Sequence, residues 1–333
     1  MIIKYVPYQP HCFAFGGFDM QMLNTLKSAI NNGAQASKLD FWSRDNNFDI
    51  LHLWGISQQN FHLIDWGKKS NKLIVATVLL PYFDTVKSNL SYYKDFFSSW
   101  HRQLIHYYNL VDSFVVLNEL QSDVLREYYK VPNHKINIIP NIVDDNFFKK
   151  PTINFAKKHN IDAYILCVGN VSRRKNQYNL AKACVSNGLK LVIIGSVLDG
   201  EDDYGILLKQ VTENTDNILW INELETGSDE LVSAFYYCNL FALPSNEETQ
   251  PISLLEATAM NKPILTLDRA YANQKYYKYA IKAKSGSVQD IIEAINSANI
   301  TNIQNEFIDE CRSEIVGEKY HKLYKNLIDE NLI

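Results

Sequence analysis

Residues 240–257 read LFALPSNEETQPISLLEA and pass from an apolar run, through a polar loop, into an apolar helix pattern. The run Leu240–Leu243 is short and uninterrupted. Such runs are typical of strands that are covered on both faces, as in parallel sheets. The stretch is therefore interpreted as a strand, a loop and a helix in succession.

The same succession repeats along the second half of the chain. We expect strands at Tyr164–Val168, Leu191–Ile194, Ile218–Ile221, Leu240–Leu243 and Ile264–Leu267, and helices near 176–187, 229–237, 252–260 and 288–297. Strands that alternate with helices predict a parallel, doubly wound sheet.

The first half follows the same rhythm. We expect strands at residues 2–6, Phe48–Leu53, Leu73–Leu80, Ser113–Leu117 and Ile136–Ile139, a helix opened by Gly16-Gly17 and closed by Gly33, and a helix through about Tyr129. Two such runs predict an α/β protein with two Rossmann-like, doubly wound domains. A chain of 333 residues is long enough to hold both.

Polar residues and Pro151 separate the two runs, which places the linker at about 145–162. The predicted domains are residues 1–150 and 160–302. Residues 303–333 carry the pattern of one amphipathic helix. This helix would pack either on the second domain or back on the first, and the pattern leaves both alternatives open.

The bulk composition excludes several classes of protein. The formal net charge is −4, whereas binding to nucleic acid requires a basic face. The five cysteines are odd in number and lack CxxC spacing, so we expect free thiols and a cytoplasmic protein. The sequence contains no run of about 18 apolar residues, which a membrane-spanning helix would need. The N-terminal apolar run is too short for a signal peptide.

Glu248 and Glu256 are the chemically informative residues of the opening stretch. Glu248 falls in the loop at the carboxyl end of a strand, where open α/β sheets bind ligands, and a helix start there offers N–H groups to an anion. Carboxylates accept strong hydrogen bonds from sugar and ribose hydroxyls, so the pair would suit two polyols on either side of a diphosphate. The alternative is that both are surface charges near a helix start.

The stretch resembles the E-x7-E motif of the retaining GT-B glycosyltransferases of family 4. Other segments resemble motifs of that family in the same order along the chain. They are Gly16-Gly17 for the glycine loop, Asp49–Gly55 for the second strand, Ile139–Asp144 for the strand end before the linker, Val168–Asn176 for the phosphate-binding turn, Ala257–Ile264 for the helix end, and the final helix. The resemblance covers almost the whole chain and implies the GT-B fold, with a cleft between two domains.

The resemblance implies transfer of a sugar from a nucleotide-sugar donor to an acceptor hydroxyl, with retention, in polysaccharide or glycoconjugate assembly. The first domain would bind a glycan, glycolipid or protein acceptor, and the second the donor. Glu248 would contact the transferred sugar as the catalytic residue, Glu256 the ribose and Lys175 the diphosphate. The other expected donor-binding residues are Gly16, Gly17, Asn170, Arg173, Arg174, Thr249, Gln250, Pro251 and Ile252.

The phosphate-binding turn departs from the family pattern. The arginine expected directly after Gly169 is replaced by Asn170. Arg173 or Arg174 would then supply the missing charge, unless both only face solvent.

A histidine expected after the third strand is also missing. Tyr82 or Asp84 would supply that contact, whereas His101 and His106 are expected to be structural or exposed. The aromatic-rich residues 82–108 would pack as helices or meet sugars or a membrane surface. Peripheral association with a membrane is therefore one expectation for the chain.

No metal or cofactor is expected. Asp199, Asp202 and Asp203 are interpreted as a solvated loop rather than a metal site. The rival functions are a sugar-nucleotide epimerase of the same architecture and a non-catalytic subunit that binds a nucleotide-sugar. A nicotinamide dehydrogenase is poorly supported, because no GxGxxG follows the first strand.

Overall fold

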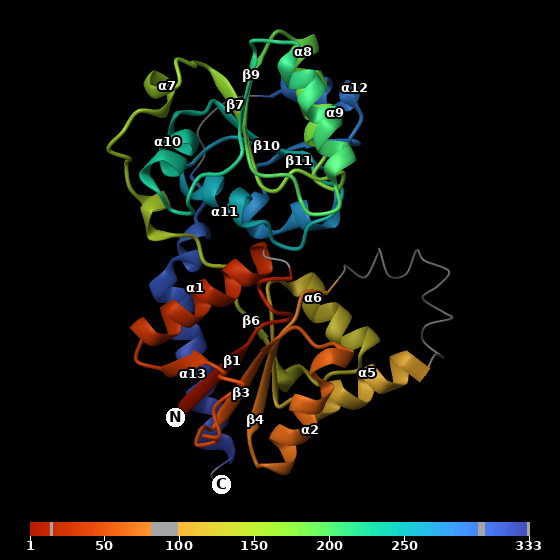
Figure 1. Cartoon of the computed structure of the whole chain (residues 1–333), viewed down its shortest axis with the longest axis vertical. Coiled ribbons are helices and arrows are strands. Elements are labelled where there is room, and N and C mark those ends of the chain that lie inside the picture. The colour runs from red at the N-terminus through yellow and green to blue at the C-terminus, as the bar shows by residue number, and fades with distance from the viewer. Residues whose placement is uncertain (14–15, 81–98, 299–303, 332–333) are drawn as a thin grey trace. The chain divides into compact units, whose positions relative to one another are not determined.

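The computed structural model describes residues 1–13, 16–80, 99–298 and 304–331. The chain divides into two compact units, labelled by element in Figure 1. Unit 1 comprises Met1–Ile142 and Glu310–Ile333, and unit 2 comprises Val143–Asp309. Each unit contains a six-stranded sheet in which the paired strands run parallel. The predicted α/β class with two Rossmann-like sheets is confirmed.

The sheet of unit 1 has the strand order β2-β1-β3-β4-β5-β6. Its strands are β1 Ile2–Val6, β2 Gln35–Lys38, β3 Ile50–Trp54, β4 Leu73–Thr77, β5 Ser113–Val116 and β6 Ile136–Ile138. The described helices of this unit are α1 Gly17–Asn31, α2 Phe61–Lys69, α5 Ser99–Leu110, α6 Glu119–Asp123 and α13 Ser313–Asn331, and a π-helical turn covers Val124–Tyr128.

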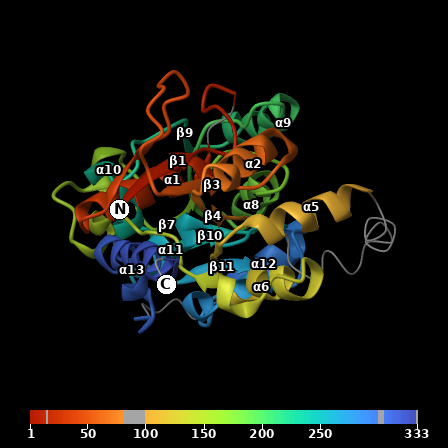
Figure 2. The ribbon, with the colours of Figure 1, turned by 90° about the horizontal axis from the view of Figure 1, so that it is seen from below.

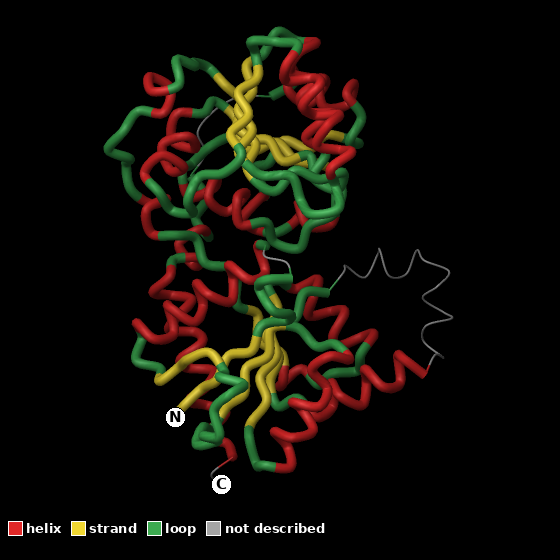
Figure 3. The backbone as a smooth tube through the Cα atoms, viewed as in Figure 1, coloured by secondary structure: helices red, strands yellow, loops and turns green. Residues whose placement is uncertain are grey.

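Unit 1 has one hydrophobic core on each face of its sheet. Ile50 and Trp54 enter the core that contains α1 and α13, whereas Leu51 and Leu53 enter the core with α2 and α5. Alternate side chains of a strand point to opposite faces, so β3 must be apolar at nearly every position. Figure 3 shows the strands of this unit between helices.

A chain of buried polar groups joins α13 to the sheet of unit 1. The Tyr324 hydroxyl lies 2.7 Å from His52 Nδ1 and 2.5 Å from the Tyr5 hydroxyl. His52 Nε2 lies 2.8 Å from Thr77 Oγ1. Burial lowers the pKa of His52 to about 3, so its imidazole is neutral and both ring nitrogens are used. A Cβ on Gly317 would also collide with α1, which shows how closely α13 approaches that helix.

The sheet of unit 2 has the strand order β12-β11-β10-β7-β8-β9. Its strands are β7 Tyr164–Val168, β8 Lys190–Ile194, β9 Ile218–Ile221, β10 Leu240–Leu243, β11 Ile264–Leu267 and β12 Ile281–Ala283. Its helices are α7 Phe155–Lys158, α8 Gln177–Ser186, α9 Asp202–Glu213, α10 Asp229–Tyr237, α11 Ile252–Ala259 and α12 Val288–Asn296. Among the described residues, 3-10 turns cover Gln58–Asn60, Asn133–Lys135, Asp145–Phe148, Ala270–Asn273, Lys275–Tyr277 and Ile308–Cys311.

Several element boundaries differ from those expected. β3 begins at Ile50 rather than at the predicted Phe48, and β4 ends at Thr77 rather than at the predicted Leu80. The segment 145–162 contains a 3-10 turn and α7, which pack on α10 within unit 2, instead of forming a free linker. The final helix begins at Ser313, after a 3-10 turn, and packs on α1.

The acidic segment at 199–203 is only partly a loop, which corrects the sequence interpretation. Asp202 and Asp203 form the first turn of α9. Acidic side chains are favoured at that position, because the N-terminal end of a helix carries partial positive charge. None of the described helices is long and apolar enough to cross a membrane.

Candidate functional site

The sheet order of unit 2 fixes where its ligand site belongs. β7 has β8 on one side and β10 on the other. The chain therefore leaves β7 in one direction and later returns to its opposite side. In open α/β sheets, the carboxyl ends of the strands at such a reversal are the usual place for ligands. The two loops at this point are residues 169–176 and 244–251.

The loop 244–251 is held by hydrogen bonds from the segment after β11. The Tyr271 hydroxyl donates to the Ser245 carbonyl oxygen over 2.8 Å. Gln274 Nε2 donates to the Thr249 carbonyl over 2.6 Å, and Gln250 Nε2 donates to Gln274 Oε1 over 2.9 Å. Gln250 is thus a buried brace of the loop. These contacts fix the conformation of the loop, which carries Glu248 and leads directly into α11.

The turn 169–176 is shaped by two glycines with positive φ. Gly169 has φ +138° and Gly195 has φ +154°, and a Cβ on Gly195 would strike the Gly169 carbonyl. A Cβ on Gly169 would lie 2.7 Å from Lys175 Nζ. The absence of that atom lets Lys175 fold back over the turn. Gln177 Nε2 closes the turn by donating to the Asn170 carbonyl over 3.0 Å.

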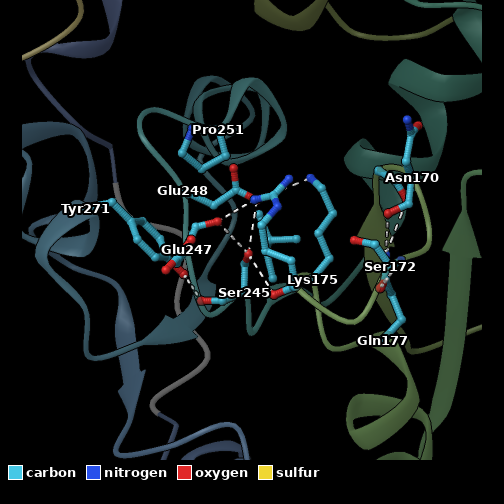
Figure 4. A network of polar contacts seen from close by, with 12 residues as sticks. Asn170, Ser172, Lys175, Gln177, Ser245, Glu247, Glu248, Pro251 and Tyr271 are labelled. Carbon is cyan, nitrogen blue, oxygen red and sulfur yellow. Dashed lines mark hydrogen bonds and ion pairs between the residues drawn. The ribbon is translucent and has the colours of Figure 1, made fainter. Parts of the chain in front are cut away.

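The Glu248 carboxylate contacts two cations from this turn, Arg174 and Lys175; Figure 4 labels Glu248 and Lys175 in the same cluster. Its Oε1 lies 2.8 Å from Arg174 Nη1 and 3.4 Å from Lys175 Nζ, and it accepts a hydrogen bond from Ser245 Oγ over 3.1 Å. The Glu248 side chain is 10% exposed. Burial alone would raise the pKa of this carboxyl, but the two cations and the hydrogen bonds outweigh it and lower the pKa. Glu248 is therefore ionised in the chain without ligand.

Glu256 has the opposite environment in the same motif. It is 4% exposed and lies within α11. Burial, together with the nearby negative charge of Asp144, raises its pKa to about 8. Within the described residues, no hydrogen bond or ion pair reaches its carboxyl group. Its oxygens are not among the described side-chain atoms that are fully buried without a partner, so they retain some access to solvent, and a hydroxyl ligand could reach them there.

The two arginines of the turn have different surroundings. Arg174 contacts Glu248 and the Glu247 carbonyl. Arg173 pairs instead with Asp203 and, over 3.7 Å, with Glu201. Its guanidinium carbon also lies 5.5 Å from the centre of the Tyr204 ring. Arg174 therefore belongs to the Glu248 cluster, and Arg173 belongs to the start of α9.

The remaining predicted residues do not all come together. The Asn170 side chain points away from the Glu248 cluster in Figure 4. Pro251 precedes α11, and Ile252 is its first residue. Tyr82 and Asp84 lie outside the described residues. His101 is buried on α5, and His106 is exposed on the same helix.

Gly16 and Gly17 lie in unit 1, at the start of α1. The Gly16 N–H donates to Asp19 Oδ2 over 2.9 Å, so this amide already has an acceptor. A Cβ on either glycine would meet no atom within 4 Å. Gly16 has extended backbone with φ −158°. The described fold of the unit therefore does not itself require glycine at these two positions.

Three neighbours of the site were not anticipated from the sequence. Tyr271 and Gln274 come from a segment with no clear periodicity, and only their contacts with the loop reveal them. Asp144 stands in a segment that was singled out as a strand end, without any role assigned to its carboxylate. Within the described residues, no three His, Cys, Asp or Glu side chains gather as metal ligands would.

Two protein-family models match the sequence. The model for glycosyl transferases group 1 matches residues 149–330, more than half of the chain, and the model for Glycosyltransferase Family 4 matches residues 16–147. The chain belongs to the glycosyl transferases group 1 family. This membership makes the protein a glycosyltransferase, and it places Glu248, Glu256 and Lys175 inside the part matched by the first model.

Solved glycosyltransferase structures share the fold at low sequence identity. The glycosyltransferase from Rickettsia africae ESF-5 is 13% identical with a TM-score of 0.69, and the match covers 98% of each chain. Anabaena Alr3699/HepE in complex with UDP and glucose is 13% identical with a TM-score of 0.69, covering 100% of this chain and 99% of that one.

Sucrose-phosphate synthase from Thermosynechococcus elongatus is 13% identical with a TM-score of 0.74, covering 99% of each chain. These likenesses establish the two-domain GT-B architecture for this member of the family. No significant match was found among curated proteins.

Proposed function

We propose that this glycosyltransferase moves a sugar from a nucleotide-sugar to an acceptor hydroxyl with retention of configuration at the anomeric carbon. The observation that carries the proposal is the contrast within one motif. Glu248 is ionised between two cations, and Glu256 is buried without a partner. A diphosphate flanked by two polyols would use all four groups.

The cations are the proposed binding site for the donor diphosphate. Without ligand, Arg174 and Lys175 both pair with the Glu248 carboxylate. A donor would bring competing phosphate oxygens, and charge-assisted hydrogen bonds to them are strong. Glu248 would then be released toward the hydroxyls of the transferred sugar. The N–H of Ile252, the first residue of α11, would add a dipole at the phosphate.

Glu256 is the proposed partner of the ribose. Its carboxyl group lies in α11, which begins directly after the loop that carries Glu248. Ribose hydroxyls would donate to this carboxylate and favour its ionised form, which burial alone opposes. A uridine diphosphate donor is the first choice to examine, because Anabaena HepE was crystallised with UDP and glucose.

The proposed reaction uses no protein nucleophile. The bond between the anomeric carbon and the phosphate oxygen breaks, and the acceptor oxygen forms a bond to the same face of that carbon. The acceptor proton passes to the departing phosphate. Lys175 and Arg174 stabilise the negative charge that develops there, and the site positions both reactants. Acceptors would be glycans, glycolipids or proteins bound by unit 1, as in polysaccharide or glycoconjugate assembly.

The donor is identified first by a thermal-shift screen of UDP-, GDP-, ADP- and CMP-sugars, since a ligand of the folded state raises its melting temperature. Calorimetry then compares Glu256→Ala and Glu248→Ala. Glu256→Ala should weaken binding of the free nucleoside diphosphate by roughly 10- to 100-fold, as expected for the loss of a charged hydrogen bond. Glu248→Ala should spare that affinity and depress turnover. Equal losses of affinity in both variants would refute the assignment.

Retention needs a separate measurement. NMR of the transfer product at the earliest time points reports the configuration of the new glycosidic bond. Retention predicts that the product has the same anomeric configuration as the donor. An inverted product would overturn this part of the proposal while leaving the donor site intact. Consumption of donor without acceptor would instead indicate an epimerase or a hydrolase.

A further inference from the structure

The polar contacts of Glu248 fall on one oxygen of its carboxylate. Oε1 lies 2.8 Å from Arg174 Nη1 and 3.4 Å from Lys175 Nζ, and it accepts from the Ser245 hydroxyl over 3.1 Å. Among the described residues, no hydrogen bond or ion pair reaches Oε2. Oε2 is therefore the oxygen that a ligand hydroxyl can take, and the contacts of Oε1 decide where Oε2 points.

The Ser245 hydroxyl has one hydrogen to donate and three acceptors within reach. Besides Glu248 Oε1, these are the carbonyl oxygens of Glu247 at 3.1 Å and of Arg174 at 3.2 Å. Both carbonyls already accept from another donor, the first from the Arg174 guanidinium and the second from the Asn246 N–H. A hydrogen bond to a charged acceptor is roughly twice as strong as one to a neutral acceptor. The carboxylate should therefore hold the hydroxyl in preference to either carbonyl.

Ser245 is held in place from both sides of β10. This strand lies between β7 and β11 in the sheet of unit 2, and Figure 2 labels all three strands. On the β11 side, the Tyr271 hydroxyl donates to the Ser245 carbonyl over 2.8 Å and lies 2.7 Å from Thr266 Oγ1. On the β7 side, the Asn246 N–H donates to the Arg174 carbonyl over 2.8 Å. Because Ser245 is also fully buried, its hydroxyl is a fixed point beside Glu248.

We propose that Ser245 is the positioning residue of Glu248 during transfer. Arg174 and Lys175 pair with Glu248 in the chain without ligand, and under the proposed function they turn to the donor diphosphate. The Ser245 hydroxyl is then the contact of Oε1 that remains. It fixes the carboxylate at Oε1 and so directs Oε2 to a hydroxyl of the transferred sugar. This inference rests on the proposed function, and it adds a residue that acts through Glu248 and not on the substrates.

The alternative is that the Ser245 side chain only braces the loop. The contacts that brace the loop use backbone groups instead, because the Ser245 carbonyl accepts from Tyr271 and the Asn246 N–H donates to Arg174. Both bonds persist when the hydroxyl is removed. The loop conformation therefore does not need the hydroxyl, whereas the orientation of the Glu248 carboxylate does.

The first experiment uses the protein without ligand and determines which acceptor the hydroxyl takes. Chemical denaturation at neutral pH measures the folding equilibrium of Ser245→Ala in the parent and in Glu248→Ala. The loss should be roughly 10- to 100-fold in the parent, as for a hydrogen bond to a charged group, and about 2- to 10-fold in Glu248→Ala, as for a bond to a neutral carbonyl.

The matched control is Ser233→Ala. Ser233 is another fully buried serine of unit 2, and its hydroxyl donates to the Ile153 carbonyl over 2.9 Å. This variant should lose the same stability in both backgrounds, because its hydroxyl does not contact Glu248. It should also keep the turnover of the parent.

The second experiment measures transfer from the nucleotide-sugar that raises the melting temperature most in the panel of UDP-, GDP-, ADP- and CMP-sugars. Ser245→Ala should lower kcat about tenfold and leave the affinity of the matching nucleoside diphosphate unchanged, because both cations keep their side chains. Its effect on kcat should vanish in the Glu248→Ala background. Ser245→Thr keeps a hydroxyl and should restore most of the turnover, whereas Ser245→Cys offers only a weak donor and should behave as Ser245→Ala.

Three results would overturn the proposal. One is an equal loss of stability from Ser245→Ala in both backgrounds, and another is a Ser245→Ala variant whose kcat matches that of the parent. The third is a loss of kcat in Ser245→Ala that persists in the Glu248→Ala background, because the hydroxyl would then act through some other group. Failure of the proposed function is distinguishable from these, since Glu248→Ala alone would then keep the turnover of the parent.

Discussion

Glu248 and Glu256 are chemically identical residues that the fold treats in opposite ways. Both belong to a motif whose resemblance to the family implies one shared site, whereas spacing alone leaves open the alternative of two surface charges near a helix start. What spacing does not predict is their ionisation, because that depends on residues distant in sequence. Arg174 and Lys175 come from the turn after β7, and Asp144 comes from the start of unit 2.

The raised pKa of Glu256 predicts a specific dependence of stability on pH. Its pKa is about 8 in the folded chain against 4.5 for the ordinary group, so between these values the folded state binds the proton more tightly. The free energy of unfolding should therefore fall as pH rises through this window, by at most about 1.4 kcal/mol per pH unit. The Glu256→Gln variant lacks this titrating carboxyl group, so its free energy of unfolding should not fall in this way. The difference in free energy of unfolding between variant and parent should therefore grow in favour of the variant up to about pH 8.

Chemical denaturation of parent and variant from about pH 5 to pH 9, without nucleotide, measures this difference. Glu248→Gln is the matched control, because its pKa is lowered and the sign is reversed. Ionised Glu248 contributes stability above its ordinary pKa, so this variant should lose stability relative to the parent at neutral pH. A difference between parent and Glu256→Gln that does not change with pH would contradict the assignment.

The three cations of the turn should not be equivalent. Lys175→Ala and Arg174→Ala should each weaken binding of the nucleoside diphosphate by roughly 10- to 100-fold, while binding of the nucleoside changes little. Arg173→Ala should behave as the parent, because Arg173 pairs with Glu201 and Asp203. Calorimetry with both ligands makes the comparison. Equal losses of diphosphate affinity in Arg173→Ala and Arg174→Ala would contradict the assignment of Arg174, rather than Arg173, to the phosphate.

At the scale of elements, the sequence predicts the buried strands well because burial on both faces produces uninterrupted apolar runs. β10 and β11 were expected within the bounds that the structure has. β2 was not expected, because Gln35–Lys38 is a polar edge strand whose side chains are mostly exposed. α9 was missed because its first turn is acidic and follows a glycine, which is also typical of a loop.

The packing of α13 on unit 1 depends on a few specific contacts that a substitution can test. Its apolar stripe predicts a packed helix without naming the surface that it packs on. Tyr324 makes the choice specific, because its hydroxyl contacts both His52 and Tyr5. Tyr324→Phe should lower the free energy of unfolding by about 1–3 kcal/mol, since two buried polar groups lose a partner.

Denaturation followed by fluorescence measures this loss, because the Trp54 ring lies 4.5 Å from the His52 ring, between centroids. Lys322→Ala removes an exposed side chain from the same helix and should leave stability nearly unchanged. If Tyr324→Phe were as stable as the parent, the polar chain would contribute nothing to docking of the helix.

At the scale of the whole molecule, the order of weak motifs predicts more than any one of them. Gly16-Gly17, the turn after β7 and the stretch 240–257 are each only weak or moderate indications of the family when taken alone. Their succession along the chain predicts the GT-B family, and the family models agree. The hydrogen bonds that orient the loop after β10 could not be predicted, because Tyr271 and Gln274 stand in short 3-10 turns and their flanks, without periodicity.

The whole set of charges leads to the last prediction, that transfer requires no divalent metal. A diphosphate leaving group needs its developing negative charge stabilised. Metal-dependent enzymes do so with a cation held by carboxylates, but Asp203 is paired with Arg173 and Asp202 stands in the first turn of α9. Lys175, Arg174 and the start of α11 offer fixed positive charge and dipoles in place of the ion. Transfer with the identified donor and acceptor should therefore continue at an undiminished rate in EDTA. Activity that vanishes with EDTA and returns with Mg²⁺ or Mn²⁺ would show that these cations do not suffice.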